Sequence, residues 1–337
     1  MNMTQDASSV PTQVPVTLIC GFLGSGKTSL VNVILNAQLG QRIVVVVNEF
    51  GEVDIDSRLV LHADDSVIAL RNGCICCTVR SDLNSTLHQL LIRRRQTVDA
   101  LAFKRILIEA SGLASPGPTV QSILADPFLS SQLLWEAGVT LVHAQHIVRQ
   151  LHEYPEVSEQ MAYADQIVLN HCDRCSSEDL EGAESAVRSC NPHAAIHRTS
   201  HAQVDVPSLL TARTWDTIWG LDREAVRPRD AVITAAHTHG VDSLSLYSAH
   251  PVDLDRLQVW LRSIIDDPSI DMMRIKGLVR CPQHAEAVMV QGVYQWFDMR
   301  LADGCGPQDS ILVVIGRGFN REAIRQSWAN CQIPYEG

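Results

Sequence analysis

GFLGSGKTS, residues 21–29, is the most informative stretch of this chain. It satisfies the pattern G-x-x-x-x-G-K-[ST], and it lies between an apolar run at 15–20 and a segment with helical spacing at 27–39. A strand, a glycine-rich turn and a helix in this order are the context that a phosphate-binding loop requires. The alternative is a glycine-rich turn without a ligand, but here the motif and its context are present together. We therefore predict a loop that binds nucleotide phosphates.

Several residues of this loop have an expected contact with the nucleotide. Backbone N–H groups of Gly24, Ser25 and Gly26 can point at phosphate oxygens, helped by the helix N-terminus. Lys27 supplies a positive charge to the outer phosphates, and the Thr28 hydroxyl can bind Mg²⁺. The predicted nucleotide-binding residues here are Gly21, Gly24, Ser25, Gly26, Lys27, Thr28 and Ser29, and Lys27 is also predicted to be catalytic.

Apolar runs alternate with helical segments over the first two thirds of the chain. The expected strands are residues 15–20, 42–50, 66–70, 103–110, 138–144 and 165–170, and helices are expected at 27–39 and 82–95. Such alternation is typical of an α/β fold with a doubly wound, mostly parallel sheet.

The pattern changes after the charged stretch 221–230. Beyond it, strands are expected at 231–237, 243–250, 274–280, 287–299 and 310–317, with helices at 253–266 and 320–331. Clustered strands with two helices predict a smaller α+β domain. The expected organisation is a flexible N-terminus at 1–14, a nucleotide domain at 15–222, a linker at 223–230 and a C-terminal α+β domain at 231–337.

Composition narrows the class of protein. The formal net charge of −11 disfavours binding to nucleic acid or to an anionic membrane surface. The polar N-terminus lacks the apolar segment of a signal peptide, and no apolar run approaches a membrane span. Ten cysteines without an export signal indicate reduced thiols in the cytoplasm. We expect a cytoplasmic monomer or homodimer with no nucleic-acid or membrane partner.

The stretch ILIEASGLASP at 106–116 has the place of a second nucleotide motif. Glu109 ends the expected strand, where a carboxylate can hold a Mg²⁺-bound water or orient the attacking water, so we predict a catalytic role. Ser111 and Gly112 would allow close approach to the γ-phosphate. A buried strand that merely ends in glutamate is the alternative.

Two further loops carry polar side chains suited to nucleotide chemistry. NEFGEVDID at 48–56 is either a solvated acidic loop or a switch segment that senses Mg²⁺ and the γ-phosphate. In LNHCDRC at 169–175, Asn170 and Asp173 have N-x-x-D spacing. The Asp173 carboxylate can accept hydrogen bonds from guanine N1–H and the 2-amino group, whereas the alternative is an Asx turn.

These motifs, together with GCICC at 73–77, resemble the CobW family of P-loop GTPases. That family includes cobalamin-biosynthesis, nitrile-hydratase-activator and zinc-chaperone branches. HTHG at 237–240 and MMRIKGLV at 272–279 are similar to its C-terminal domain, so the resemblance covers nearly the whole chain. It implies hydrolysis of GTP to GDP with Mg²⁺, coupled to binding of a metal and its delivery to a client metalloprotein.

The resemblance places the metal motif on Cys74, Cys76 and Cys77. Three thiolates on a tight loop suit Zn²⁺, with Co²⁺, Ni²⁺ and Fe²⁺ remaining open, and three ligands leave one position free for release. Glu49 or Glu52 could add an oxygen ligand in one nucleotide state. A structural zinc site or a redox loop is the alternative for the cysteines. For the protein, the alternatives are a nucleotide-gated metal sensor or storage protein and a dedicated Co or Fe metalloenzyme activator.

Some residues depart from the family pattern. His171 replaces the lysine of N-K-x-D, whose stem covers the base, and an imidazole could stack there instead. His143 stands where an acidic residue is expected. The pair Cys172 and Cys175 is interpreted as incidental rather than as a second metal site. His237 and His239 are interpreted as a polar strand end, with an auxiliary metal site as the alternative.

Overall fold

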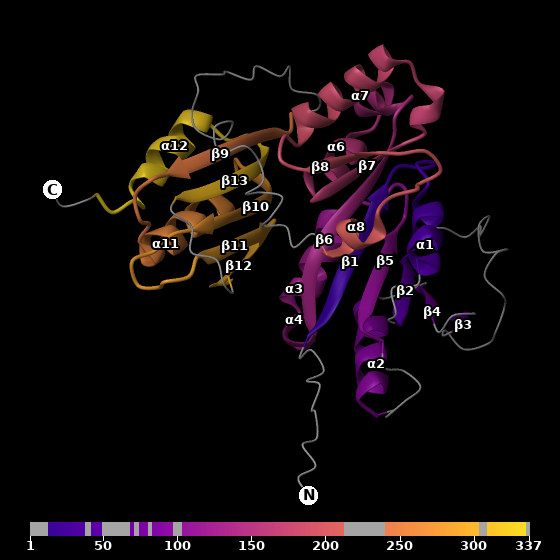
Figure 1. The fold of residues 1–337 in the computed structure, drawn as a ribbon. Helices are drawn as coiled ribbons and strands as arrows, with labels where there is room; N and C mark the ends of the chain where they lie inside the picture. The colour runs from indigo at the N-terminus through magenta and orange to yellow at the C-terminus, as the bar shows by residue number, and fades with distance from the viewer. Residues whose placement is uncertain are drawn as a thin grey trace, which may run out of the picture.

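The computed structural model describes residues 13–37, 42–48, 68–70, 74–79, 83–96, 103–211, 240–302 and 309–334. Figure 1 shows two parts side by side, an α/β part built from the first two thirds of the chain and a smaller sheet with two helices. Within these ranges no helix combines the length and the apolar character needed to cross a bilayer.

The first sheet has the strand order β3-β4-β2-β5-β1-β6-β7-β8 among the described residues. Its strands are β1 (Val14–Gly21), β2 (Ile43–Asn48), β3 (Ile68–Leu70), β4 (Cys74–Val79), β5 (Arg105–Ala110), β6 (Leu133–His143), β7 (Gln166–Asn170) and β8 (Ala195–Arg198). All neighbours pair in parallel except β3 and β4. Every residue of β5 and β7 is buried, as expected for a sheet covered on both faces.

Helices cover both faces of this sheet. They are α1 (Lys27–Asn36), α2 (Leu83–Gln96), α3 (Pro116–Ala125), α4 (Pro127–Gln132), α5 (Ile147–Glu153), α6 (Pro155–Ala162), α7 (Ser177–Cys190) and α8 (Val206–Thr211), with a short 3₁₀ turn, η2 (Cys172–Arg174). Neighbouring residues of β1 face opposite ways, so Leu18 packs with α2 and α3 while Ile19 packs with α1 and α8. The predicted doubly wound α/β fold is therefore confirmed.

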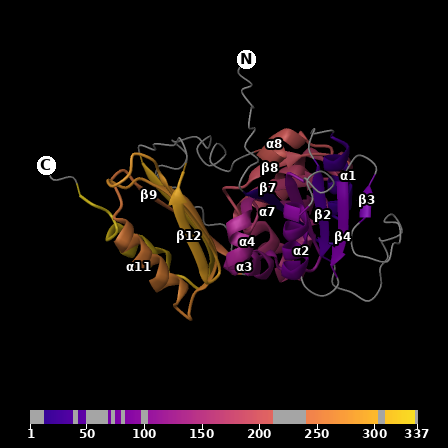
Figure 2. The same ribbon diagram turned by 90° about the horizontal axis from the view of Figure 1, so that it is seen from below.

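The second sheet is antiparallel, in the order β12-β11-β10-β13-β9. Its elements are β9 (Asp242–Ser248), α11 (Leu254–Ile265), β10 (Asp271–Val279), β11 (Val288–Val293), β12 (Trp296–Leu301), β13 (Ser310–Arg317) and α12 (Arg321–Ala329). Helices α11 and α12 cover the face turned away from the first part (Figure 1), and Figure 2 shows the same for α11. On the opposite face, Met273, Val313 and Ile315 join the apolar core of the first part. The two parts therefore share a packed interface.

Three details differ from the sequence prediction. The cysteines expected on a loop lie on strand β4, because residues 74–79 pair with β2 and extend the sheet. The single strand predicted at 287–299 is a hairpin, β11 and β12, which turns at Tyr294 with a φ of 50°. Strand β8 was not predicted at all. The strand expected at 231–237 and the linker at 223–230 lie outside the described residues.

Candidate functional site

The glycine-rich loop joins β1 to α1 with a backbone that only glycine adopts readily. Gly21, Gly24 and Gly26 have φ values of 142°, 74° and 105°. A Cβ at Gly21 would collide with the carbonyl oxygen of Leu141 on β6, so this position also lacks the space for a side chain. The loop conformation is thus fixed by its glycines and by close packing against the sheet.

The loop has the features of an anion cradle. Gly26 caps α1 without any side-chain hydrogen bond, which leaves the first N–H groups of the helix for a ligand. The Ser25 hydroxyl is buried and makes no hydrogen bond within the described part of the chain. A buried hydroxyl without a partner is costly, and a phosphate oxygen is a suitable acceptor for it. The predicted phosphate-binding residues therefore fit a nucleotide.

The two predicted catalytic motifs meet at the end of β1. The Thr28 hydroxyl donates a hydrogen bond of 2.8 Å to the Glu109 carboxylate, which is 7% exposed. The register that pairs Ile19 with Glu109 brings them together. The Lys27 ammonium donates to the carbonyl oxygens of Gly21, at 2.9 Å, and Phe22, at 3.4 Å. A hydroxyl beside a carboxylate is an oxygen donor set that fits Mg²⁺.

The predicted base-recognition loop is tied to the glycine-rich loop through Asn170. Its amide nitrogen donates to the Ser25 carbonyl oxygen at 2.9 Å, and its amide oxygen accepts from the Ala202 N–H at 3.0 Å. The contact with the loop after β8 was missed by sequence reasoning, because that loop carries no recognisable motif. Asn170 therefore positions both loops at the same edge of the sheet.

Asp173 lies on η2 with its carboxylate exposed to solvent. A hydrogen bond with the Ser200 side chain is the main cause that lowers the pKa of Asp173 below its usual value. The carboxylate is thus ionised at neutral pH and accepts hydrogen bonds only. An acceptor of this kind at the edge of the loop matches the N–H groups of a guanine base.

His171 stacks on another histidine rather than standing alone. Its backbone is left-handed, with a φ of 64°, and its ring lies 4.2 Å from the ring of His143. His143 in turn stacks on His146, also at 4.2 Å. Burial first, and then the neighbouring His171 and His146, lower the pKa of His143 to about 4. The two departures from the family pattern, His143 and His171, therefore stack on each other, and the His143 imidazole is uncharged at neutral pH.

The predicted metal ligands are described only in part. Strand β4 carries Cys74, Cys76 and Cys77, and the described structure there is limited to the backbone. Strand β2 lies between β4 and β5. On one side Val46 of β2 pairs with Cys77, and on the other side the next residue, Val47, pairs with Glu109. The cysteine strand is therefore two strands from the Glu109 strand, about 10 Å away. Glu49 and Glu52 lie outside the described residues.

The described structure gives no metal site at the remaining candidates, Cys172 and Cys175. The Cys172 thiol donates to the Leu169 carbonyl oxygen at 3.1 Å, and burial raises the pKa values of both Cys172 and Cys175. Neutral thiols bonded to the main chain are poor metal ligands. Among the described side chains, which do not include those of residues 74–79, no three histidine, cysteine or acidic groups are arranged to hold a metal. His237 and His239 lie outside these ranges.

Three features define a P-loop nucleotide-binding protein. They are the glycine-rich phosphate-binding loop, the Glu109 carboxylate next to the Thr28 hydroxyl, and the doubly wound sheet. The comparison with protein families is more specific. The nucleotide-binding domain of the CobW/HypB/UreG family matches residues 15–198, and the CobW C-terminal domain matches residues 241–332. The chain belongs to the CobW/HypB/UreG family, in its CobW branch with the C-terminal domain.

Relatives of known name cover nearly the whole chain. The zinc chaperone YjiA of Escherichia coli is 29% identical over 322 residues, which span 94% of this chain and 98% of YjiA. The zinc chaperone CobW of Pseudomonas aeruginosa is 29% identical over 354 residues, which span 93% of this chain and 90% of that protein. The crystal structure of the Zn(II)-bound YjiA GTPase from E. coli matches with a TM-score of 0.73 at 27% identity, covering 95% and 99% of the two chains.

Proposed function

We propose that this protein is a GTP-hydrolysing metallochaperone that binds a transition metal, Zn²⁺ above all, at Cys74, Cys76 and Cys77 and delivers it to a client metalloprotein. The observation that carries the proposal is the register of the sheet. It sets the cysteine strand two strands from Glu109, whose carboxylate accepts the hydrogen bond from Thr28. A metal site at that distance can respond to the state of the γ-phosphate.

The nucleotide half of the proposal assigns a role to each described side chain. The backbone of the glycine-rich loop and Lys27 bind the phosphates, and Asp173 accepts from the guanine edge. Thr28 and Glu109 would hold Mg²⁺, which neutralises charge on the β- and γ-phosphates when it is bound. In its alternative role, Glu109 would orient the attacking water instead of holding the ion. Without a stimulating partner such sites turn over at about 10⁻⁴ to 10⁻² s⁻¹.

The metal half rests on donor chemistry and on the relatives. Three thiolates are soft donors that suit Zn²⁺, and a site with fewer than four protein ligands can release its metal. Two relatives that match most of this chain are named zinc chaperones. Glu49 or Glu52, on the segment after β2, would add an oxygen ligand in one nucleotide state and withdraw it in the other.

Steady-state GTP hydrolysis by the purified chain, with Lys27→Ala as the variant, tests the nucleotide half. We expect slow turnover in the parent and loss of both phosphate binding and turnover in the variant. An unchanged rate in Lys27→Ala would exclude this loop as the site. Asp173→Asn should weaken GTP binding and improve binding of xanthosine triphosphate, because the amide donor matches the xanthine 2-carbonyl. Equal affinity of the parent for ATP and GTP would contradict guanine recognition.

A further inference from the structure

Helix α6 holds the loop that follows Glu109 through one buried side chain. Gln160 is 1% exposed, and its amide nitrogen donates to the carbonyl oxygens of Gly112 and Ala114, each at 3.1 Å. The main-chain carbonyl oxygen of Gln160 accepts from the Thr140 hydroxyl at 2.8 Å, which fixes α6 against β6. Two carbonyl oxygens of one short loop are therefore anchored by a residue that is distant in sequence.

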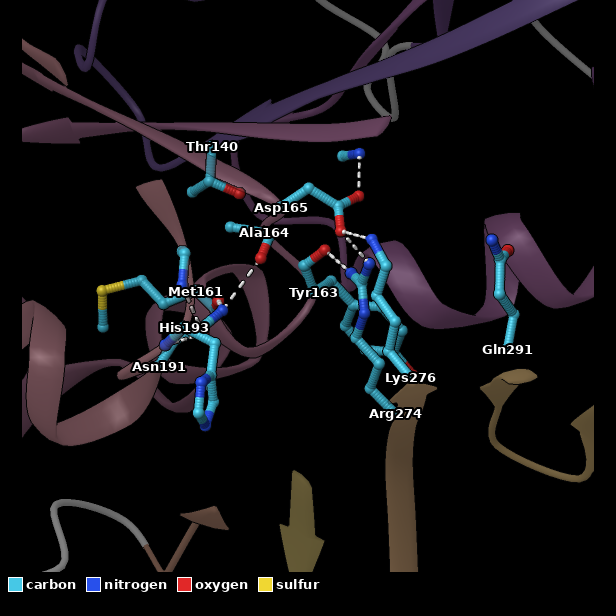
Figure 3. Close-up of polar contacts among 12 residues, drawn as sticks. Thr140, Met161, Tyr163, Ala164, Asp165, Asn191, His193, Arg274, Lys276 and Gln291 are labelled. Carbon is cyan, nitrogen blue, oxygen red and sulfur yellow. Dashed lines mark hydrogen bonds and ion pairs between the residues drawn. The ribbon is translucent and has the colours of Figure 1, made fainter. Parts of the chain in front are cut away.

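The C-terminal end of α6 is held by the second sheet. Arg274 of β10 donates to the main-chain oxygen of Tyr163 and forms an ion pair with Asp165, and Lys276 reaches the same carboxylate at 2.5 Å (Figure 3). The Tyr163 hydroxyl donates to the Met273 carbonyl oxygen at 2.6 Å. Figure 3 shows the Asp165 carboxylate turned toward the two cations from β10. These contacts fix Tyr163 and Asp165, which follow the end of α6 shortly after Gln160.

Two more contacts lead from the second sheet to the same region. Arg317 of β13 forms an ion pair of 3.1 Å with Glu159, the residue before Gln160. Gly117, in the first turn of α3, leaves no room for a side chain, because a Cβ there would collide with the rings of Tyr294 and Tyr163. The loop at 111–115 is thus held on one side by α6 and continues into a helix that packs on the second sheet.

We propose that Gln160 is a positioning residue for GTP hydrolysis, and that the C-terminal sheet controls the hydrolysis rate through its contacts with α6. The inference rests on the proposed GTPase function. The loop at 111–115 would bring Gly112 close to the γ-phosphate, and Gln160 determines how firmly that loop is held.

Gln160→Met tests the first part, because it keeps the side-chain size and removes both hydrogen bonds. We expect kcat for GTP to fall about 5- to 30-fold, as for the loss of two neutral hydrogen bonds. KM should stay within about twofold, because Gln160 touches neither the phosphate loop nor the base loop. Gln160→Asn keeps an amide on a shorter side chain, so its kcat should lie between those of the parent and of Gln160→Met. This second variant keeps the prediction testable if Gln160→Met folds poorly.

Arg274→Met and Arg317→Met test whether the C-terminal sheet controls the hydrolysis rate. Each should lower kcat about 2- to 5-fold at unchanged KM, because Arg317 loses its ion pair with Glu159 on α6, and Arg274 loses its contacts with Tyr163 and Asp165 just after α6. Combined with Gln160→Met, the effect on kcat should be smaller than the product of the single effects, since both changes loosen one loop. Arg321→Met is the control: Arg321 pairs with Asp242 at 3.4 Å within the C-terminal part, and its loss should leave kcat unchanged.

The outcomes separate the two ideas. An unchanged kcat in Gln160→Met and Gln160→Asn overturns the positioning role. A lowered kcat in Gln160→Met with no change in Arg274→Met and Arg317→Met overturns control by the C-terminal sheet. A parent that hydrolyses no GTP overturns the proposed function together with this inference, whereas unchanged kcat values in an active parent overturn the inference alone.

Discussion

Replacing Asp165 with asparagine removes the charge at the centre of the interface between the two sheets. The Asp165 side chain is 3% exposed, and those of Arg274 and Lys276 are 12% and 10% exposed. Burial raises the pKa of Asp165, but the two cations and a hydrogen bond from the Gly138 N–H more than offset this, so that its pKa is lowered overall. In Asp165→Asn two buried cations would face a neutral amide.

The expected loss of stability is large. Removing one partner of a buried ion pair costs about 3–5 kcal/mol, because the other charge stays buried without compensation. The pKa of Lys276 is lowered to about 8, mainly because the ammonium is buried, even though Asp165 lies next to it. Without that carboxylate its pKa should fall further, so Lys276 releases its proton more readily. The loss should therefore shrink as the pH rises from 6 to 9.

Urea unfolding at several pH values measures this loss, with tryptophan fluorescence as the signal. Trp260 and Trp328 report on the C-terminal core, where their ring centroids lie 5.5 Å apart. Asp242→Asn is the matched control: its partner Arg321 is 37% exposed, so about 0–1 kcal/mol is expected. If Asp165→Asn costs no more than this control at pH 6 to 7, the buried cluster does not hold the two sheets together.

Two further predictions concern the nucleotide edge. Asn170→Ala removes the hydrogen bonds to the Ser25 carbonyl oxygen and from the Ala202 N–H, so affinity for GTP should fall roughly tenfold in a calorimetric titration; an unchanged affinity would contradict the role of Asn170. His143 has a folded pKa of about 4. An unfolded histidine titrates near 6.5, so the unfolded chain binds more protons between these values, and stability should fall as the pH drops from about 6.5 to 4. His143→Phe should flatten this part of the stability curve, and an unchanged slope would exclude His143 as its cause.

The parts of the site that were predictable lie on single stretches of sequence. Gly21, Gly24 and Gly26 occupy backbone positions that only glycine adopts readily, so their spacing alone indicated the loop. Glu109 and Asp173 each follow or end an apolar strand, and parallel strands bring such ends to one edge of the sheet. Local pattern was therefore sufficient to predict the fold class and to single out the strand ends that meet at this edge of the sheet.

The parts that were missed depend on contacts between distant residues or on weak local signals. Asp165 and Lys276 are 111 residues apart, and no local sequence pattern around either residue indicates that they pair. The hairpin of β11 and β12 turns at Tyr294, a residue that rarely adopts a positive φ, so no turn was predicted there. The cysteine segment resembled a loop because of its flanking glycine, and only its pairing with β2 identifies it as a strand.

The central claim is that the cysteine strand and the nucleotide respond to each other. The direct measurement is the affinity for Zn²⁺ of three forms, the apo protein, the complex with a non-hydrolysable GTP analogue and the GDP complex. A triple variant with Cys74, Cys76 and Cys77 replaced by serine is the control. We expect tight binding of one Zn²⁺ per chain, lost in the triple variant, with the affinities of the nucleotide complexes differing by about 5- to 150-fold.

By linkage, Zn²⁺ must change the ratio of affinities for the GTP analogue and GDP by the same factor, which a reciprocal nucleotide titration measures. Equal factors in the two titrations would support a metal site coupled to the nucleotide. One Zn²⁺ affinity in all three forms would contradict the coupling, and undiminished binding by the triple variant would show that Cys74, Cys76 and Cys77 are not the ligands.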